Sequence, residues 1–386
     1  MNLLFLFYFI LLVYLFFIIW ILWGLPKSTV DLKAQDDQPQ TRFSIIIPMR
    51  NEAANLPQLL RSISELTYPP HLLEFFFIDD DSEDESWSLV RGFQSSHRSI
   101  PIFLLSNSVE KSEKDTLEAT YTPKKRAIHR AITLASCPYI ITTDADVILP
   151  QQWLRAYDGK LQKTNADLIA GGVVVAKANS FLSHYQHYDM LSLQLFGYGS
   201  FERNQPVICN GANLCYKKES YIQADVHRGK ENIASGDDVF TLQKFKALDY
   251  HIEYLYDPKS LVWTSAVKSF EALLEQRRRW AKKSTAVDSF YLKGVGVLVM
   301  FMQLSLVLSV IFSVFNTVYL GFLINAFILK FCVDAWSLKR MAKLQDLEMC
   351  WIDFLKVSLV YPFFNLMFAV SGLYGKFDWK GRRYSK

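Results

Sequence analysis

Long uncharged stretches lie near both ends of the chain, and short apolar and amphipathic segments alternate between them. Residues 3–25 carry no charge and are long enough to cross about 30 Å of hydrocarbon as a helix. A signal peptide would begin with basic residues and end in small ones, so this stretch predicts an uncleaved membrane anchor over residues 1–26. Lys27, Lys33 and Arg42 follow the stretch and place its C-terminal side in the cytoplasm.

A second uncharged stretch covers residues 295–329. It is too long for one ordinary span, so we expect two helices that turn tightly near Asn316 and Thr317. Lys330 would then snorkel from the end of the second helix to the interface. Basic residues flank the pair on both sides and predict that both flanks lie in the cytoplasm.

A third uncharged stretch covers residues 357–375 and is interrupted by Pro362 and Asn365. Simple alternation of spans would export the tail at residues 376–386, yet this tail is strongly basic. The positive-inside rule favours a cytoplasmic tail. The pattern therefore favours a re-entrant or interfacial segment over a third span.

Between these ends, residues 43–285 show β-rich apolar runs that alternate with amphipathic helical segments. The predicted strands are residues 43–47, 74–78, 100–105, 139–143 and 166–176. The predicted helices are residues 51–66, 124–135, 181–201, 235–248 and 270–283. This alternation predicts an α/β domain with a mostly parallel sheet flanked by helices, between a polar linker at 27–42 and a membrane region at 290–375. Ligands of such sheets bind beyond the carboxyl ends of the strands.

Two acidic groups lie where predicted strands end. Asp144 and Asp146 follow an apolar, β-branched run, where a carboxylate is costly unless a cation pairs with it. Such a pair can hold Mg²⁺ or Mn²⁺ beside a diphosphate, although a chance surface loop also explains the tripeptide alone. Asp79 and Asp80 end another strand and are expected to share the cleft, with a solvated Asp-rich turn as the alternative.

Two loops carry further polar signals. Asn51 and Glu52 lie in the first strand-to-helix loop, where they suit ligand contact or helix capping. Lys124, Lys125 and Arg126 begin a helix, which is a good place to meet phosphate charge. A solvated run of charges is the alternative for these three.

Two more motifs follow later in the chain. Asp237 and Asp238 begin a helix, where carboxylates favour the macrodipole in any case. If one of them is desolvated in the cleft, its pKa would rise and it could act as a general base. Gln276, Arg279 and Trp280 precede a membrane stretch, and flanking positive charge explains the arginines there but not Gln276 and Trp280.

The order and spacing of these motifs resemble the membrane-anchored branch of family-2 glycosyltransferases, with cellulose synthase, hyaluronan synthase and ceramide glucosyltransferase relatives. The matching segments are residues 45–52, 78–82, 124–128, 143–146, 236–238 and 276–280. The resemblance covers about residues 43–280. It implies a GT-A type nucleotide-diphosphosugar domain, Mg²⁺ or Mn²⁺ as cofactor, and inverting sugar transfer from a donor that is expected to be a UDP-sugar.

The resemblance also implies roles for individual residues. Asp238 would be the catalytic base, and Asp146 together with Asp144 would hold the metal. Contacts to the nucleotide-sugar are implied for Pro48, Asn51, Glu52, Asp79, Asp80, Lys124 and Asp144. Contacts to the acceptor or diphosphate are implied for Gly211, Ala212, Asn213, Asp237, Gln276, Arg279 and Trp280.

Two positions depart from the family pattern. Asp81 replaces the usual glycine of an Asp-Asp-Gly-Ser turn, and aspartate tolerates left-handed backbone better than most residues do. His129 stands where asparagine is common, and we expect it to pack or cap rather than to catalyse.

Composition narrows the function classes. Apolar residues make up 51% and aromatic residues 15% of the chain, which excludes disorder and agrees with membrane segments. A net charge of +4 does not argue for nucleic acid as a partner, and five scattered cysteines suggest neither a disulfide framework nor a zinc site. The expected protein is a multi-pass enzyme of the inner or plasma membrane with a cytoplasmic catalytic domain and a lipid or glycan acceptor.

Three other classes fit less well. A processive polysaccharide synthase would need more spans to line a channel. A non-catalytic nucleotide-sugar-binding scaffold would not need Asp146, Asp238 and the Gln276–Trp280 element. A transporter would need more spans and more polar groups within them.

Overall fold

The computed structural model describes residues 2–26, 38–106, 122–226, 236–285, 287–373, 377–379 and 382–384. The chain divides into two compact units, each built from separate stretches of sequence. Unit 1 comprises Met1–Ser28, Val175–Val207 and Ala266–Lys386, and unit 2 comprises Thr29–Val174 and Ile208–Ser265.

Unit 2 is built on a seven-stranded sheet with the order β3-β2-β1-β4-β8-β6-β9. Its strands are β1 (Phe43–Met49), β2 (Leu73–Asp79), β3 (Ile102–Ser106), β4 (Tyr139–Thr142), β6 (Leu168–Gly171), β8 (Leu214–Lys217) and β9 (Ile252–Leu255). All neighbouring pairs are parallel except the two that involve β8, which is antiparallel to β4 and to β6. The predicted, mostly parallel sheet is thus confirmed, with one reversed strand.

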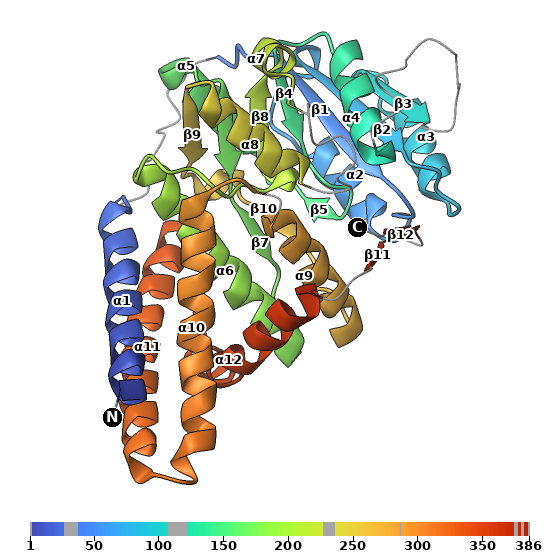
Figure 1. Ribbon diagram of the computed structural model, residues 1–386. Helices are drawn as coiled ribbons and strands as arrows, with labels where there is room; N and C mark the ends of the chain where they lie inside the picture. Colours follow the sequence, from blue (N-terminus) through green and yellow to red (C-terminus); the bar gives the residue numbers. More distant parts are fainter. Residues whose placement is uncertain are drawn as a thin grey trace. The chain divides into compact units, whose positions relative to one another are not determined.

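Helices cover both faces of this sheet (Figure 1). The helices of unit 2 are α2 (Leu56–Ser64), α3 (Ser86–Ser96), α4 (Pro123–Leu134), α5 (Trp153–Thr164), α7 (Lys218–Ala224) and α8 (Asp237–Ala247). Ile45 and Ile47 belong to a core that also contains Trp153 and Tyr157 of α5, while Ile46 points to the opposite face and is equally buried. Burial on both faces explains why the central strands are continuous apolar runs rather than alternating ones.

Short elements complete unit 2. A second sheet has the order β5-β10-β7, with β5 (Val147–Ile148), β10 (Val262–Thr264) and β7 (Val173–Val175). The 3₁₀ turns are η1 (Pro70–Leu72), η3 (Gly211–Asn213) and η4 (Pro258–Ser260). The single strand predicted over residues 166–176 is therefore wrong, because the chain leaves one sheet after Gly171 and joins the other at Val173.

Unit 1 is helical. Its helices are α1 (Asn2–Gly24), α6 (Phe181–Glu202), α9 (Phe270–Thr285), α10 (Phe290–Ser313), α11 (Thr317–Leu344) and α12 (Trp351–Leu373), followed by a hairpin of β11 (Phe377–Trp379) and β12 (Arg382–Tyr384). Four of the described helices are long and apolar enough to cross a membrane, namely α1, α10, α11 and α12. Figure 1 shows α1, α10 and α11 side by side, and they share an apolar cluster that includes Leu11, Met302 and Phe322.

The helix pair predicted near Asn316 is confirmed. Helix α10 ends at Ser313, and the Asn316 side chain caps α11 by accepting a hydrogen bond from Val318 N at 3.0 Å. The predicted snorkelling of Lys330 is wrong, because α11 continues to Leu344 and Lys330 is only 8% exposed. Its ammonium group pairs with Asp334 one turn later, which neutralises the charge within the bundle.

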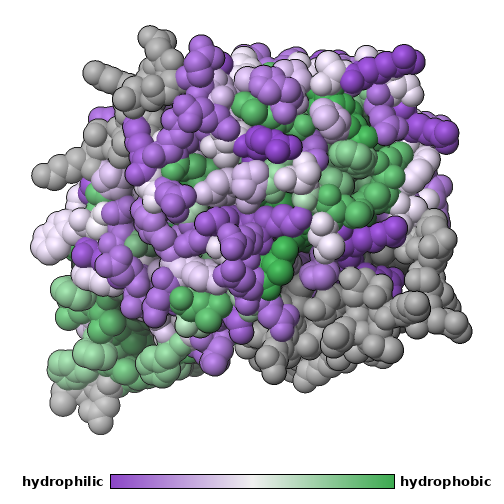
Figure 2. All heavy atoms as spheres, turned by 90° about the horizontal axis from the view of Figure 1, so that it is seen from above, coloured by the Kyte–Doolittle hydropathy of each residue, from purple (hydrophilic) through white to green (hydrophobic). Residues whose placement is uncertain are grey.

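The helices α6 and α9 group with the apolar helices in unit 1 rather than with the sheet. The division of the chain into units therefore differs from the continuous domain expected over residues 43–285. Helix α12 continues through Pro362, so the proline does not end it. Figure 2 shows the face of unit 2 that carries α5 and α7, and hydrophilic residues cover most of this face.

Candidate functional site

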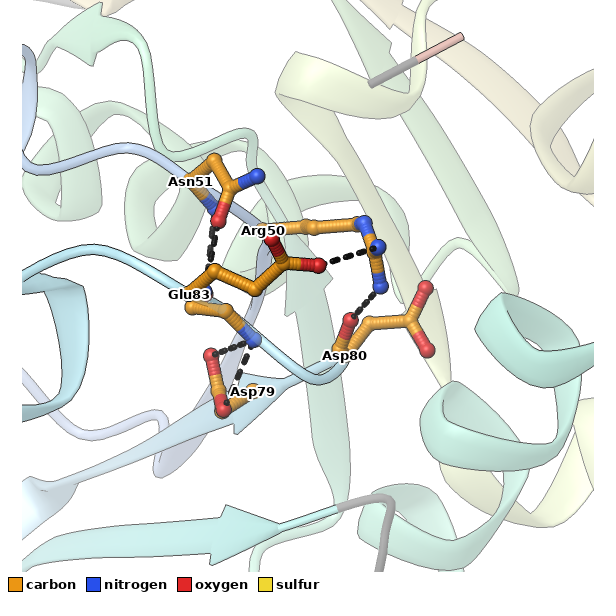
Figure 3. A network of polar contacts seen from close by, with 6 residues as sticks. Arg50, Asn51, Asp79, Asp80 and Glu83 are labelled. Atoms are coloured by element: carbon orange, nitrogen blue, oxygen red, sulfur yellow. Dashed lines mark hydrogen bonds and ion pairs between the residues drawn. The ribbon is translucent and has the colours of Figure 1, made fainter. Parts of the chain in front are cut away.

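The loops that follow β1 and β2 are bonded to each other (Figure 3). Asp80 N donates to Met49 O at 2.9 Å, and Arg50 Nη1 donates to Asp80 O at 2.5 Å. Arg50 is buried and its second guanidinium nitrogen lies 3.8 Å from Glu83. The carboxyl ends of two parallel strands thus form one surface, as the sequence predicts.

Asn51 and Glu52 form hydrogen bonds that stabilise this surface. Asn51 has a positive φ of 51°, and its side-chain oxygen accepts a hydrogen bond from Glu83 N at 2.8 Å. Glu52 is buried, and its backbone N donates to Ser86 Oγ at 2.7 Å. Asn55, not Asn51 or Glu52, is the N-cap of α2, so side-chain capping does not explain these two residues.

The acidic end of β2 is partly closed off from solvent. Asp79 and Asp80 are both buried, and Asp79 accepts a hydrogen bond from Ser82 N. Burial raises the pKa of Asp79 above its usual value, although the hydrogen bonds from Ser82 oppose this. Asp81 has a φ of 57°, so the left-handed turn expected from the replaced glycine is confirmed.

The end of β4 carries the Asp-x-Asp pair. Thr143 N donates to Ile46 O at 3.1 Å, which places the pair at the same sheet edge as the loops after β1 and β2. Asp144 is half-buried and Asp146 is exposed, and β5 then pairs with β10 directly behind them. Within the described ranges, no group of three or more His, Cys, Asp or Glu side chains could hold a metal ion. Two carboxylates suit Mg²⁺ or Mn²⁺, which keep several water or phosphate ligands.

The η3 turn is hydrogen-bonded both to Thr143, next to Asp144, and to Asp238. Thr143 Oγ1 donates to Ala212 O at 2.8 Å, and Gly211 N donates to Asp238 Oδ2 at 2.9 Å. The other carboxylate oxygen of Asp238 accepts a hydrogen bond from Val239 N at 2.7 Å. The antiparallel direction of β8 explains this arrangement, because it brings the residues before β8 to the edge where β4 ends.

Lys125 also reaches this region. It is fully buried in α4, its Nζ lies 3.9 Å from Asp237 Oδ1, and it lies 5.2 Å from the ring centroid of Phe240. The sequence predicts that Lys125 meets phosphate charge or belongs to a solvated run of charges, and its burial excludes the solvated run for this residue. Its spacing from the apolar residues Ile128 and Ile132 places it on the buried face of the helix, and that signal could have identified it. The side chain of Lys124, the predicted diphosphate contact, lies outside the described side chains.

The remaining predicted site residues divide between the units. Asn213 is fully buried in unit 2, whereas Gln276, Arg279 and Trp280 lie on α9 in unit 1. Within unit 1, Arg277 lies 4.2 Å from the ring centroid of Trp280. The structure thus joins the segments that carry Asp79, Asp80, Asp144, Asp146, Gly211, Asp237 and Asp238 at one sheet edge, and the contacts predicted for α9 stay predictions.

Comparison with known proteins agrees with this geometry. The model of Glycosyl transferase family 2 matches residues 44–223, and the model of Glycosyl transferase family group 2 matches residues 139–337, more than half of the chain. Glycosyltransferase AglE of Haloferax volcanii is 23% identical over 239 residues, which are 62% of this chain and 71% of that protein. Probable glycosyltransferase YdaM of Bacillus subtilis is 20% identical over 258 residues, 62% of this chain but only 54% of that protein.

A solved structure shows the same fold. It is the mannosyltransferase PcManGT from Pyrobaculum calidifontis in complex with GDP-Man and Mn²⁺, with a TM-score of 0.54 at 16% identity. The match covers 95% of this chain and 93% of that chain. The predicted fold class, a GT-A type domain with apolar helices, is confirmed.

Proposed function

Because the chain belongs to the family-2 glycosyltransferases, we propose that it transfers a sugar from a nucleoside-diphosphate donor to an acceptor hydroxyl with inversion at the anomeric carbon. The observation that carries the proposal is the Asp238 carboxylate, which Gly211 N–H and Val239 N–H hold at the start of α8. Through η3 this carboxylate is tied to Thr143, next to Asp144. The segments that carry the proposed base and the proposed metal-binding pair are therefore both hydrogen-bonded to η3.

The chemical step needs one base and no nucleophile of the protein. Asp238 accepts the proton of the acceptor hydroxyl, and the oxygen attacks the anomeric carbon from the face opposite to the diphosphate. A new C–O bond forms, and the bond to the diphosphate breaks with its electron pair on the leaving oxygen. Inversion follows from this single displacement.

Asp144 and Asp146 are the residues that would hold a divalent cation in this proposal. A cation held there would neutralise charge that develops on the leaving diphosphate. The likeness to a fold that holds GDP-Man and Mn²⁺ supports the proposal, and it adds guanosine donors to the expected UDP-sugars. Pro48, Asn51, Glu52, Asp79 and Asp80 are the proposed nucleoside contacts, and Lys124 the proposed diphosphate contact.

We propose a lipid-linked or membrane-proximal acceptor. Four candidate spans support this, because they would keep the enzyme at a bilayer. Gln276, Arg279 and Trp280 are the proposed acceptor element, with Gly211 and Asp237 on the side of the base. We also propose that the catalytic domain faces the cytoplasm and that the product is a glycolipid or an envelope glycan.

The experiment is a donor screen with the full-length protein in lipid nanodiscs. UDP- and GDP-sugars labelled in the sugar are supplied with Mn²⁺, with Mg²⁺ or with a chelator, and the label is followed into the lipid extract. We expect one donor to give a labelled lipid in the presence of a cation only. Label in a long water-soluble polymer would support the processive alternative, and nucleotide binding without any product from any donor would contradict the proposal.

A further inference from the structure

The side chain of Asn213 is completely enclosed and fully hydrogen-bonded. Its Oδ1 accepts hydrogen bonds from Trp153 Nε1 at 2.9 Å and from Tyr157 OH at 2.7 Å. Its Nδ2 donates to Gly172 O at 2.8 Å and to Ser260 O at 2.9 Å. A primary amide has two donor hydrogens and two acceptor lone pairs, so all four positions are used and none is left for a ligand.

The side-chain amide of Asn213 is also closely packed by its neighbours. A methyl group at Gly171 would lie 2.4 Å from Asn213 Nδ2 and 2.7 Å from Tyr157 OH, far closer than atoms approach each other. Gly236 is the only glycine of the described residues with a positive φ, so Gly171 is not required by its backbone conformation. The absence of a side chain there makes room for the amide of Asn213.

Asn213 is the last residue of the η3 turn, and the first residue of this turn, Gly211, is hydrogen-bonded to the candidate base Asp238. Asn213 N donates to Asn210 O at 3.0 Å, and Ala212 N donates to the Asn210 side chain at 3.0 Å. The turn is thus rigid, and a displacement at Asn213 would move Gly211 as well. Gly211 N–H is the donor that holds Asp238 Oδ2.

We infer that Asn213 is a positioning residue that fixes the position of the Asp238 carboxylate. Trp153 and Tyr157 contribute through their hydrogen bonds to the Asn213 amide, and Gly171 contributes by leaving room for it. The inference rests on the proposed role of Asp238 as the base. It replaces the direct acceptor contact expected for Asn213 from the sequence. A misplacement of about 1 Å in a catalytic group can cost about 100-fold in rate, so a small loosening of this turn has a measurable effect.

The test compares two Tyr→Phe variants of the full-length protein. Tyr157→Phe removes one donor to Asn213 and keeps the ring. Tyr68→Phe is the matched control, because Tyr68 is also buried and its hydroxyl donates to Thr41 O at 2.8 Å, but it does not contact the η3 turn. Thermal unfolding, affinity for the nucleoside diphosphate of the active donor and the kinetics of transfer are measured for both.

We expect similar small decreases in thermal midpoint for the two variants. Only Tyr157→Phe should lower kcat, by about tenfold, with KM for the donor and affinity for the nucleoside diphosphate of the active donor changed less than twofold. Gly171→Ala is a second probe from the opposite side, and in its folded fraction it should reproduce this split between kcat and KM with a larger loss. A stability role alone would affect both tyrosine variants equally and leave kcat per folded molecule unchanged.

Unchanged kcat in Tyr157→Phe would overturn the inference, even if Gly171→Ala fails to fold. Asp238→Asn separates this outcome from a failure of the proposed function. If Asp238→Asn abolishes transfer while Tyr157→Phe does not reduce it, only the positioning role is wrong. If Asp238→Asn transfers sugar at the normal rate, the assignment of the base is wrong as well.

Discussion

Each of the two units contains a buried polar side chain, and different interactions stabilise it in each unit. Around Asn213 in unit 2 the partners are neutral, and every donor meets an acceptor. Asp189 in unit 1 instead forms an ion pair: Arg277 lies 2.5 Å from one carboxylate oxygen, and the neutral Tyr361 OH donates to the other at 2.9 Å. The neutral network holds one turn, whereas the charged one joins three helices, α6, α12 and α9.

The difference has an energetic consequence. Loss of one neutral hydrogen bond costs about 1–3 kcal/mol when the partner stays buried. Loss of one member of a buried ion pair costs about 3–5 kcal/mol, because the other charge is left in a low-dielectric environment. Unit 1 should therefore respond more strongly than unit 2 to the loss of one partner.

The largest effect is expected from Arg277→Met. The side chains of Arg277 and Asp189 are only 10% and 9% exposed, so the variant leaves a buried carboxylate without its counter-charge. We expect a loss of about 3–5 kcal/mol, measured as a lower thermal midpoint in nanodiscs. The double variant Asp189→Leu with Arg277→Met should recover most of this loss. Equal stability of wild type and Arg277→Met would show that the pair is not the element that joins these helices.

The next largest effect on stability is expected at Glu74 in unit 2, and this effect depends on pH. Burial would raise the pKa of Glu74, but hydrogen bonds from Ser44, Ser136 and Cys137 outweigh it and lower the pKa below the ordinary 4.5. A carboxyl group whose pKa is lower in the folded than in the unfolded state stabilises the fold at pH values above its unfolded pKa. This contribution is lost as the pH falls below about 4.5. Glu74→Gln should cost about 1–2 kcal/mol at pH 7 and progressively less towards pH 3.

The measurement is the unfolding midpoint of both proteins across this pH range. The difference between wild type and Glu74→Gln should shrink as the medium becomes more acidic. A constant difference from pH 7 to pH 3 would mean that the ionised carboxylate does not supply the stabilisation.

A smaller effect is expected at the C-terminal end of α1. Arg340 of α11 donates to Leu22 O at 2.9 Å and to Leu25 O at 2.8 Å, where a cation interacts favourably with the last carbonyls of a helix. Arg340→Gln should cost about 1 kcal/mol in thermal stability. The matched control is Lys343→Gln on the last turn of the same helix, at an exposed position. If both variants lose the same amount, general charge rather than these two bonds explains the effect.

The smallest effect is expected from an ion pair near the surface of unit 2. Lys160 Nζ lies 2.8 Å from Glu253, with the two side chains 18% and 28% exposed. Pairs of this kind contribute about 0–1 kcal/mol, so Lys160→Ala should change the unfolding midpoint by less than any variant above. A loss comparable to that of Arg277→Met would contradict the distinction between the two units.

Several features could be predicted from the sequence because they depend on neighbouring residues. The strand before Asp144, the helix pair around Asn316 and the left-handed turn at Asp81 are examples, and all three are confirmed. Each follows from local patterning or from the preference of a single residue. The positions of the acidic pairs at one sheet edge followed from the direction of the strands.

Features that depend on distant residues were not predicted. Asn213 is enclosed by residues of α5 and η4, and Lys330 of α11 packs near Tyr14 of α1. The grouping of α6 and α9 with the apolar helices depends on contacts such as that between Asp189 and Arg277. No single stretch of sequence contains both members of these contacts, so periodicity alone does not reveal them.

The most direct test of the account is sugar transfer by Asp238→Asn, measured beside nucleotide binding on the same nanodisc samples. The substitution keeps the size of the side chain and the acceptor oxygen that Gly211 N–H bonds, but it removes the basic carboxylate. We predict an affinity for the nucleoside diphosphate of the active donor within about twofold of wild type and a loss of transfer of at least about 100-fold. Wild-type transfer by this variant would contradict the account.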